Sequence, residues 1–165
     1  MTICLGDVDD PLEGVTSTDV EDGPLTVTVD NVLDTTATGV QVMTYRATDS
    51  DGNTVINTRT YVVTSVDESV IIGTEYVIFA SDFTRRVGLV DTSSSAIIEA
   101  AKGRTYKIAD GSLSETTVIT TNGYTAVPGV YEITLAPTAE LDTKITVSAT
   151  VVTGNLPVIN ITPTV

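Results

Sequence analysis

Acidic side chains in two short segments are the residues of this chain whose types and spacing could do chemistry. Asp19, Glu21 and Asp22 belong to one turn-like segment, and Asp49 and Asp51 belong to another. Calcium binds six to eight oxygen atoms, mostly carboxylate and backbone carbonyl oxygens presented by loops. The five carboxylates therefore form a candidate calcium site, provided that the fold brings the two segments together.

The same segments have a second interpretation, which is turn formation. Asp and Asn side chains bond to their own backbone, and Gly adopts positive φ without a steric penalty, so Asp-Ser-Asp-Gly-Asn at residues 49–53 suits a tight turn. This segment also lacks the twelve-residue spacing and the final Glu of an EF-hand loop. Both interpretations stay open from the sequence alone.

Other kinds of chemistry lack the residues that they need. The chain has no histidine and one cysteine, Cys4, which excludes Ser-His-Asp and Cys-His nucleophiles, His-based zinc sites and an intrachain disulfide. No glycine-rich phosphate loop is present. A Lys–Asn isopeptide bond could form only in the second half, because residues 1–66 contain no lysine. We expect no enzymatic activity and no cofactor other than the candidate calcium ion.

The charge of the chain excludes two classes of partner. The net charge is −14. Residues 1–66 hold eleven acidic and two basic residues, and residues 67–165 hold eleven acidic and six basic ones. Such a surface repels phosphates, so we expect neither nucleic acid nor anionic lipid as a partner. No 18-residue apolar run occurs, so we expect no membrane insertion.

The elements that must position the acidic segments are predicted to be β-strands. Residues 40–48 alternate between two faces, as a strand requires, and residues 54–63 have the same character. The intervening residues 50–53 favour a tight reversal. The pattern predicts a β-hairpin that closes a small sandwich.

The second half also consists of strand-like pieces and is predicted to form a second sandwich. One helix is expected, at residues 95–102. The expected strands are residues 70–80, 87–90, 105–109, 116–120, 130–136 and 144–152. Valine and threonine dominate the chain, as in all-β proteins with short strands and polar turns.

The two halves share a partial sequence echo. Residues 38–48 align with residues 128–138 at an offset of 90, and the two segments have a Gly, a Val and two Thr in common. Each segment is followed by a turn and a strand rich in Thr and Val, at 54–63 and at 144–152. The echo predicts that both halves end in the same closing hairpin.

Three short motifs of the first half occur in an order that is typical of a known family. They are Asp-Pro-Leu-Glu-Gly-Val at 10–15, Ser-Thr-Asp-Val-Glu-Asp-Gly at 17–23 and Thr-Asp-Ser-Asp-Gly-Asn-Thr at 48–54. About the first 65 residues resemble the bacterial immunoglobulin-like domains of cell-surface proteins, a family also found in pesticidal crystal proteins. The resemblance implies an all-β fold of two tandem immunoglobulin-like β-sandwich domains, at 1–66 and 67–165. It also implies that the two acidic segments lie at one end of the first domain, with Asp7, Asp9 and Asp10 toward the other.

The function implied by this resemblance is a structural one. The modules would space a functional domain from the cell in a secreted or cell-wall-attached bacterial protein, with neighbouring modules of the same polypeptide as partners. Residues 156–165 would begin a further module, and no signal peptide is expected in this excerpt of a longer chain. The alternative is an adhesin that binds a host protein or carbohydrate through Phe79, Phe83, Arg85 and Tyr124, which requires those aromatic side chains to be exposed.

Overall fold

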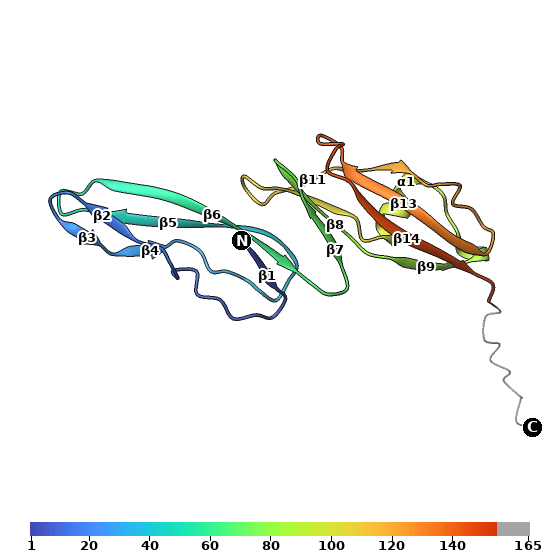
Figure 1. The fold of residues 1–165 in the computed structure, drawn as a ribbon, viewed down its shortest axis with the longest axis horizontal. Coiled ribbons are helices and arrows are strands. Elements are labelled where there is room, and N and C mark those ends of the chain that lie inside the picture. The colour runs from blue at the N-terminus through green and yellow to red at the C-terminus, as the bar shows by residue number, and fades with distance from the viewer. Residues whose placement is uncertain (155–165) are drawn as a thin grey trace, which may run out of the picture.

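The computed structural model describes residues 1–154 and shows an all-β protein built of two units that lie end to end (Figure 1). The first unit contains β1 (Thr2–Cys4), β2 (Ser17–Asp19), β3 (Gly23–Leu25), β4 (Val27–Val29), β5 (Gly39–Thr48) and β6 (Thr54–Thr64). The second contains β7 (Ser69–Ile72), β8 (Tyr76–Ala80), β9 (Phe83–Arg86), the 3-10 turn η1 (Val87–Leu89), α1 (Ser94–Ala100), β10 (Arg104–Lys107), β11 (Leu113–Ser114), β12 (Thr116–Thr120), β13 (Gly129–Pro137) and β14 (Ile145–Val152). The expected further strand at 156–165 lies outside the described residues.

The first unit is organised around the long hairpin of β5 and β6. These strands pair antiparallel from Gly39↔Val63 to Thr48↔Thr54, and the sheet order is β1-β6-β5-β4, with β1 parallel to β6. The inner face of the hairpin carries the buried core, because alternate residues of a strand share a face. This core consists of Ile3, Met43, Tyr45, Tyr61 and Val63. The short hairpin of β2 and β3 is a separate two-stranded sheet.

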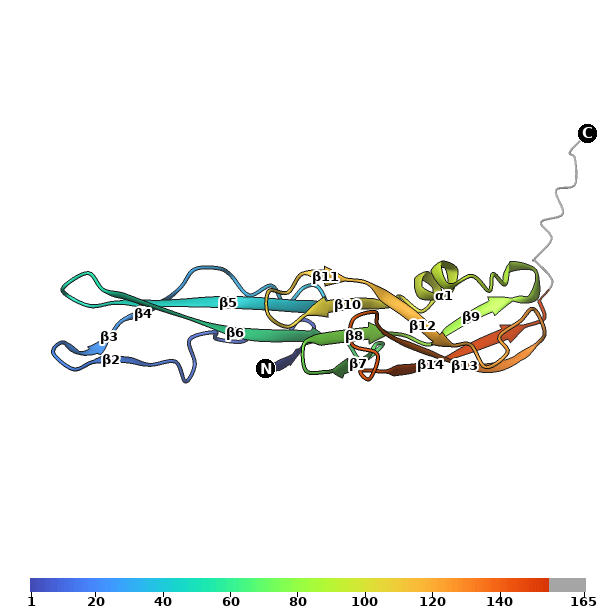
Figure 2. The ribbon, with the colours of Figure 1, turned by 90° about the horizontal axis from the view of Figure 1, so that it is seen from above.

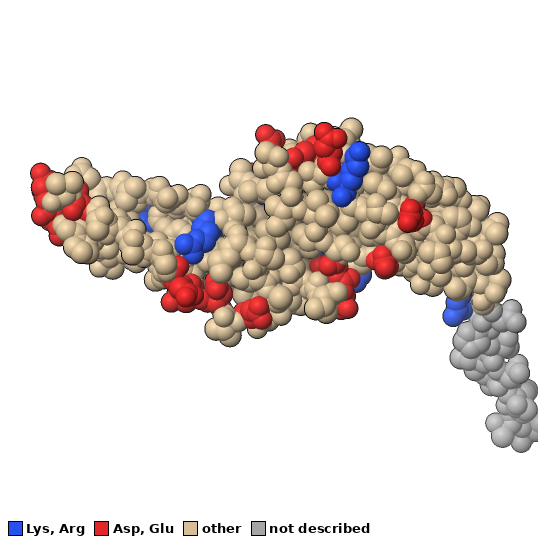
Figure 3. All heavy atoms as spheres, in the orientation of Figure 1, with Lys and Arg blue, Asp and Glu red and all other residues tan. Residues whose placement is uncertain are grey.

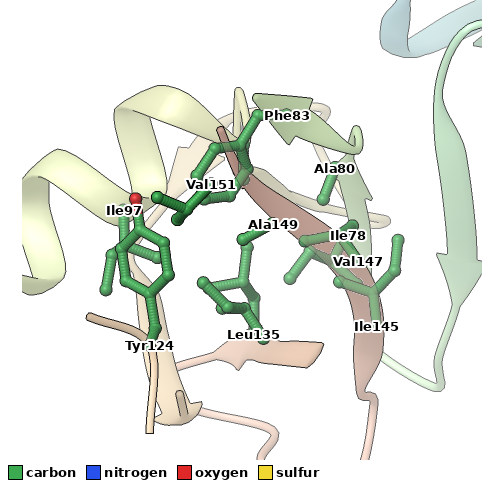
Figure 4. Packing of buried hydrophobic residues seen from close by; sticks show 12 residues of the cluster. Ile78, Ala80, Phe83, Ile97, Tyr124, Leu135, Ile145, Val147, Ala149 and Val151 are labelled. Atoms are coloured by element: carbon green, nitrogen blue, oxygen red, sulfur yellow. The ribbon is translucent and has the colours of Figure 1, made fainter. Parts of the chain in front are cut away.

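The second unit packs two four-stranded sheets and one helix around a larger core. The sheet orders are β12-β13-β14-β9 and β11-β10-β8-β7. Figure 4 shows β14 contributing every second residue to this core, and the helix contributing Ile97. The side chains from β14 are Ile145, Val147, Ala149 and Val151.

The closing hairpin that the sequence echo predicts is present in both units. β13 and β14 pair antiparallel from Gly129↔Val151 to Leu135↔Ile145, as β5 and β6 do in the first unit. In each unit the last strand also pairs in parallel with an earlier strand of that unit, β6 with β1 and β14 with β9. The two sheets therefore share one order of strands.

Several local predictions for the second half were wrong. Residues 70–80 form two strands, β7 and β8, rather than one, because the chain reverses at 73–75 and Gly73 N–H donates to the Tyr76 carbonyl. Residues 87–90 contain the 3-10 turn η1 instead of a strand, and β9 at Phe83–Arg86 was not predicted. The expected helix is present as α1, where the Ser93 side chain accepts a hydrogen bond from Ala96 N–H at the N-cap.

Within residues 1–154, the structure contains no helix of the length and apolar character that crossing a membrane requires.

Candidate functional site

The two acidic segments meet at the outer end of the first unit, the arrangement that the family resemblance implies. The turn between β2 and β3 contacts the turn between β5 and β6 through Asp22. Its carboxylate accepts hydrogen bonds from Ser50 N–H at 2.7 Å and from Ser50 Oγ at 2.8 Å. Figure 3 shows acidic side chains gathered at this end of the molecule, on the left. We call this end, made by residues 19–23 and 49–53, the acidic tip.

Two carboxylates of the acidic tip, those of Asp19 and Asp49, are occupied by donors from their own turns. Asp19 Oδ1 accepts from the N–H groups of Glu21 and Asp22, at 2.8 and 3.0 Å. Asp49 accepts from the Asn53 side chain at 2.8 Å, from Asn53 N–H at 2.7 Å and from Asp51 N–H at 3.0 Å. The backbone donors, that of Asp22 first, lower the pKa of Asp19, and the Asn53 amide is the main cause of the lowered pKa of Asp49.

This geometry supports turn formation as the role of the acidic tip. Glu21 and Asp51 enter the hydrogen bonds of their turns through backbone N–H groups. Across residues 1–154, no three acidic or cysteine side chains come together in a way that could hold a metal ion. The candidate calcium site therefore has the predicted location but not a gathered set of ligands.

The acids near the N-terminus lie in the loop that joins β1 to β2. Asp7 Oδ2 accepts from Cys4 N–H at 3.1 Å, and Asp10 Oδ1 accepts from Leu12 N–H at 2.9 Å. Leu5 N–H, just before this loop, bonds to the Thr64 carbonyl at the end of β6, the end opposite the acidic tip. These acids also cap turns.

The aromatic residues of the alternative binding interpretation are buried. Phe79 is 0% exposed, Tyr124 is 6% exposed and Phe83 is 8% exposed. Figure 4 shows Phe83 and Tyr124 inside the second core, where their rings pack edge to face with centroids 5.9 Å apart. The Arg85 guanidinium lies over the Phe83 ring at 5.6 Å. These four residues therefore do not form the exposed patch that the adhesin interpretation requires.

The sequence did not predict the contact between the two units, which forms the most distinctive site in the molecule. Val40 of β5 and Val62 of β6 lie on the outer face of the first sheet and pack against Val77 and Phe79 of β8. Val70, Tyr106 and Ile108 complete this group. We call these seven residues the junction cluster, and its four central members are at most 6% exposed.

An ion pair closes one side of the junction cluster. The Arg104 Nη2 atom lies 2.8 Å from Glu68 Oε1, and the Glu68 side chain is only 8% exposed. The same nitrogen donates to Thr38 Oγ1 of the first unit at 3.0 Å. The Arg104 guanidinium also lies over the Phe79 ring, 5.4 Å from its centroid. Arg104 therefore joins the second unit to both the linker and the first unit.

Close backbone approaches add to the junction. Thr60 Oγ1 of β6 donates to the carbonyl of Ile108 at 3.0 Å. Gly111 has φ +71°, and a Cβ atom at this position would lie 2.8 Å from the Val40 carbonyl oxygen. Only glycine fits this position without displacement, because such a distance is shorter than van der Waals contact allows.

One sequence signal could have identified the junction. The run Val77-Ile-Phe-Ala80 has no polar residue, which is typical of a strand buried on both faces. The structure shows this arrangement, with Ile78 and Ala80 in the second core and Val77 and Phe79 in the junction cluster.

Two comparisons with known proteins gave no relative. The scan against family models found no match to this chain, and the search of curated proteins found no similar sequence.

Proposed function

We propose that this chain is a non-catalytic, stiff spacer made of two immunoglobulin-like modules. The junction cluster is the observation that carries this proposal. Domains joined by a short linker move relative to one another unless their interface is large and hydrophobic. Here four nearly buried apolar side chains, a half-buried ion pair and a glycine contact join the units across a linker of residues 65–68.

The elongated arrangement suits a spacer. The two units follow one another along the long axis in Figure 1, and the molecule is also narrow in the perpendicular view of Figure 2. The long strands β5 and β6 run along that axis in the first unit, and β13 and β14 run obliquely to it in the second (Figure 1). A chain of such units gains length with each module and keeps its direction if the junctions are stiff.

The biological setting that we propose follows from the family resemblance and from the charge. A secreted or cell-wall-attached bacterial protein would carry these modules between a functional domain and the cell, with neighbouring modules as partners. The repeated strand order of the two units supports a tandem pair. The net charge of −14 suits a solvated stalk.

Small-angle X-ray scattering with calcium and with excess chelator tests this function. We expect one elongated particle whose pair-distance distribution matches the arrangement in Figure 1 and does not change with calcium, because apolar packing joins the units. A distribution that broadens or shortens in chelator would contradict this account, because it would show that a bound cation rather than apolar packing holds the arrangement of the units. A distribution typical of two freely moving units in both solutions would contradict the stiff spacer.

A further inference from the structure

The loop between β12 and β13 contains an Asn-Gly step in an open turn. Asn122 has φ 43° and Gly123 has φ 78°, and both residues are exposed. One backbone hydrogen bond, from Tyr124 N–H to the Thr121 carbonyl at 2.9 Å, spans this turn. Glycine and asparagine adopt positive φ at the least cost, so the sequence suits this backbone.

An asparagine side chain can react with the backbone that follows it. The next backbone nitrogen attacks the side-chain Cγ and forms a C–N bond, while its proton goes to the side-chain nitrogen, which leaves as ammonia. The product is a cyclic succinimide in the main chain. Water then adds to either ring carbonyl and opens the ring, which leaves aspartate or isoaspartate. The reaction needs only water, and its two reacting groups are neighbours on one chain, which favours it.

The surroundings of Asn122 favour this reaction. A side chain on the residue that supplies the nitrogen would obstruct the attack, and Gly123 has none. No atom lies within 4 Å of the position that a Cβ of Gly123 would take, and within residues 1–154 its N–H has no backbone acceptor. The Thr120 hydroxyl donates to Asn122 Oδ1 at 3.3 Å, where it can stabilise the negative charge that develops as the ring closes.

The other asparagines within residues 1–154 are hindered. Asn31 donates to a carbonyl of β5 and accepts from an N–H of the same strand, so both ends of its amide are held. The Asn53 amide donates to Asp49 Oδ2 at 2.8 Å. Asn57 lies within the paired strand β6. Each of the three is followed by a β-branched residue, whose bulk obstructs the attacking nitrogen.

Aspartate before glycine can form the same ring by losing water, and the chain has three such steps. The N–H groups of Gly52 and Gly111 each donate to a backbone carbonyl, so these two nitrogens are held. At the remaining step, the Asp22 carboxylate accepts two hydrogen bonds from Ser50. Among these sites, Asn122 is therefore the one that combines an unhindered nitrogen with an open turn.

A following unit does not need to cover this loop, as the first unit shows. At the offset of 90, β12 and the start of β13 correspond to β4 and the start of β5, and each pair is antiparallel. Residue 122 then corresponds to Val32. This side chain is 90% exposed although the second unit packs against the first. The exposure of Asn122 therefore agrees with that of the same loop in a unit that has a neighbour.

We propose that Asn122 is a site of spontaneous deamidation and that its isoaspartate product loosens the core of the second unit. Isoaspartate routes the main chain through the side-chain carbon, so it lengthens the backbone by one atom just before Tyr124. The Tyr124 ring lies in this core, edge to face with Phe83 and Tyr131 at centroid distances of 5.9 and 5.7 Å (Figure 4). The added atom displaces this ring.

The two products act differently on the fold. Aspartate keeps the normal backbone and adds one negative charge at an exposed position, so it leaves the core as it was. Isoaspartate adds the same charge and also shifts the turn. A chain that persists for long would accumulate the weakened form with age. This inference concerns the loop of the second unit and does not depend on the spacer function.

Peptide mapping of the folded chain during storage at mildly alkaline pH tests the site, since the attacking nitrogen must lose its proton. We expect Asn122 to convert at least about tenfold faster than Asn31, Asn53 or Asn57. The intact mass should rise by the difference between water and ammonia. Asn122→Gln is the matched variant, because glutamine would have to close a larger ring, and its mass should stay constant over the same time.

Melting temperature tests the consequence for the core. The isoaspartate form is isolated from the stored sample by ion exchange and compared with freshly purified Asn122→Asp, which has the same charge and a normal backbone. We expect the isoaspartate form to melt at the lower temperature. A folded chain in which Asn122 does not convert, faster conversion at Asn31, Asn53 or Asn57, or equal melting of the two forms would each overturn the proposal.

Discussion

Phe79→Ala lowers the free energy of unfolding by about 3–5 kcal/mol, the usual cost of deleting a buried phenyl ring. Phe79 is 0% exposed, and its ring packs edge to face on Tyr106 with centroids 5.6 Å apart. The ring also supports the Arg104 guanidinium. Urea denaturation followed by tyrosine fluorescence measures the loss, since the chain has six tyrosines and no tryptophan.

Phe83→Ala is the matched control for this prediction. Phe83 lies in the second core alone and does not contact the junction cluster. Both variants should lose stability, but only Phe79→Ala should speed amide exchange around Val40 and Val62 of the first unit. Equal exchange at those two residues in both variants would contradict the role assigned to the junction.

Gly111→Ala is the second large change, because it adds a side chain where the units touch. An alanine at positive φ costs about 1–2 kcal/mol at any site. At Gly111 the added Cβ must also displace the Val40 carbonyl, 2.8 Å away, and overpacking of this kind costs about 1–3 kcal/mol more. The displaced group is backbone, so the strain falls on the contact between β5 and the second unit.

Gly123→Ala is the control that separates the steric clash at Gly111 from the conformational cost of an alanine at positive φ. Gly123 has φ +78° and no atom within 4 Å of the position that a Cβ would take. Melting temperatures of the two variants should therefore differ, with Gly111→Ala the lower. Equal melting temperatures would contradict the close steric contact between the two units at Gly111.

The long hairpins were predictable because local pattern determines them. Alternation over 40–48 and 54–63 sets the strand period, and the Asp49 carboxylate organises the turn between them through three hydrogen bonds. The echo at an offset of 90 extended this prediction to β13 and β14, and the structure confirms that both pairs are antiparallel hairpins. Turn chemistry and periodicity act over a few residues, so one sequence reveals them.

The reversal between β7 and β8 could not be predicted locally, because a distant residue supports it. The Glu140 carboxylate, in the turn between β13 and β14, accepts hydrogen bonds from the N–H groups of Thr74, Glu75 and Tyr76. These donors, that of Thr74 first, lower the pKa of Glu140. Glycine is required at position 73 of this reversal, because a Cβ atom at that position would clash with the Thr143 side chain.

The junction depends on the same kind of long-range placement. Val40 and Val62 have the alternation of an ordinary outward face, which a sequence analysis assigns to solvent. They are buried because the second unit folds against them, with Arg104 reaching Thr38 across the boundary. The meeting of the two acidic segments was predictable from the implied fold. The donors that occupy their carboxylates became evident only from the atomic geometry.

Residual dipolar couplings test the central claim, the stiff junction, most directly. Backbone N–H couplings of residues 1–64 and of residues 69–154 are fitted separately in one weakly aligning medium. We expect the two fits to give one alignment tensor, with the same orientation and magnitude, because the junction cluster holds the units as one body. Two tensors of different magnitude would show that the units move independently and would contradict the spacer proposed for this chain.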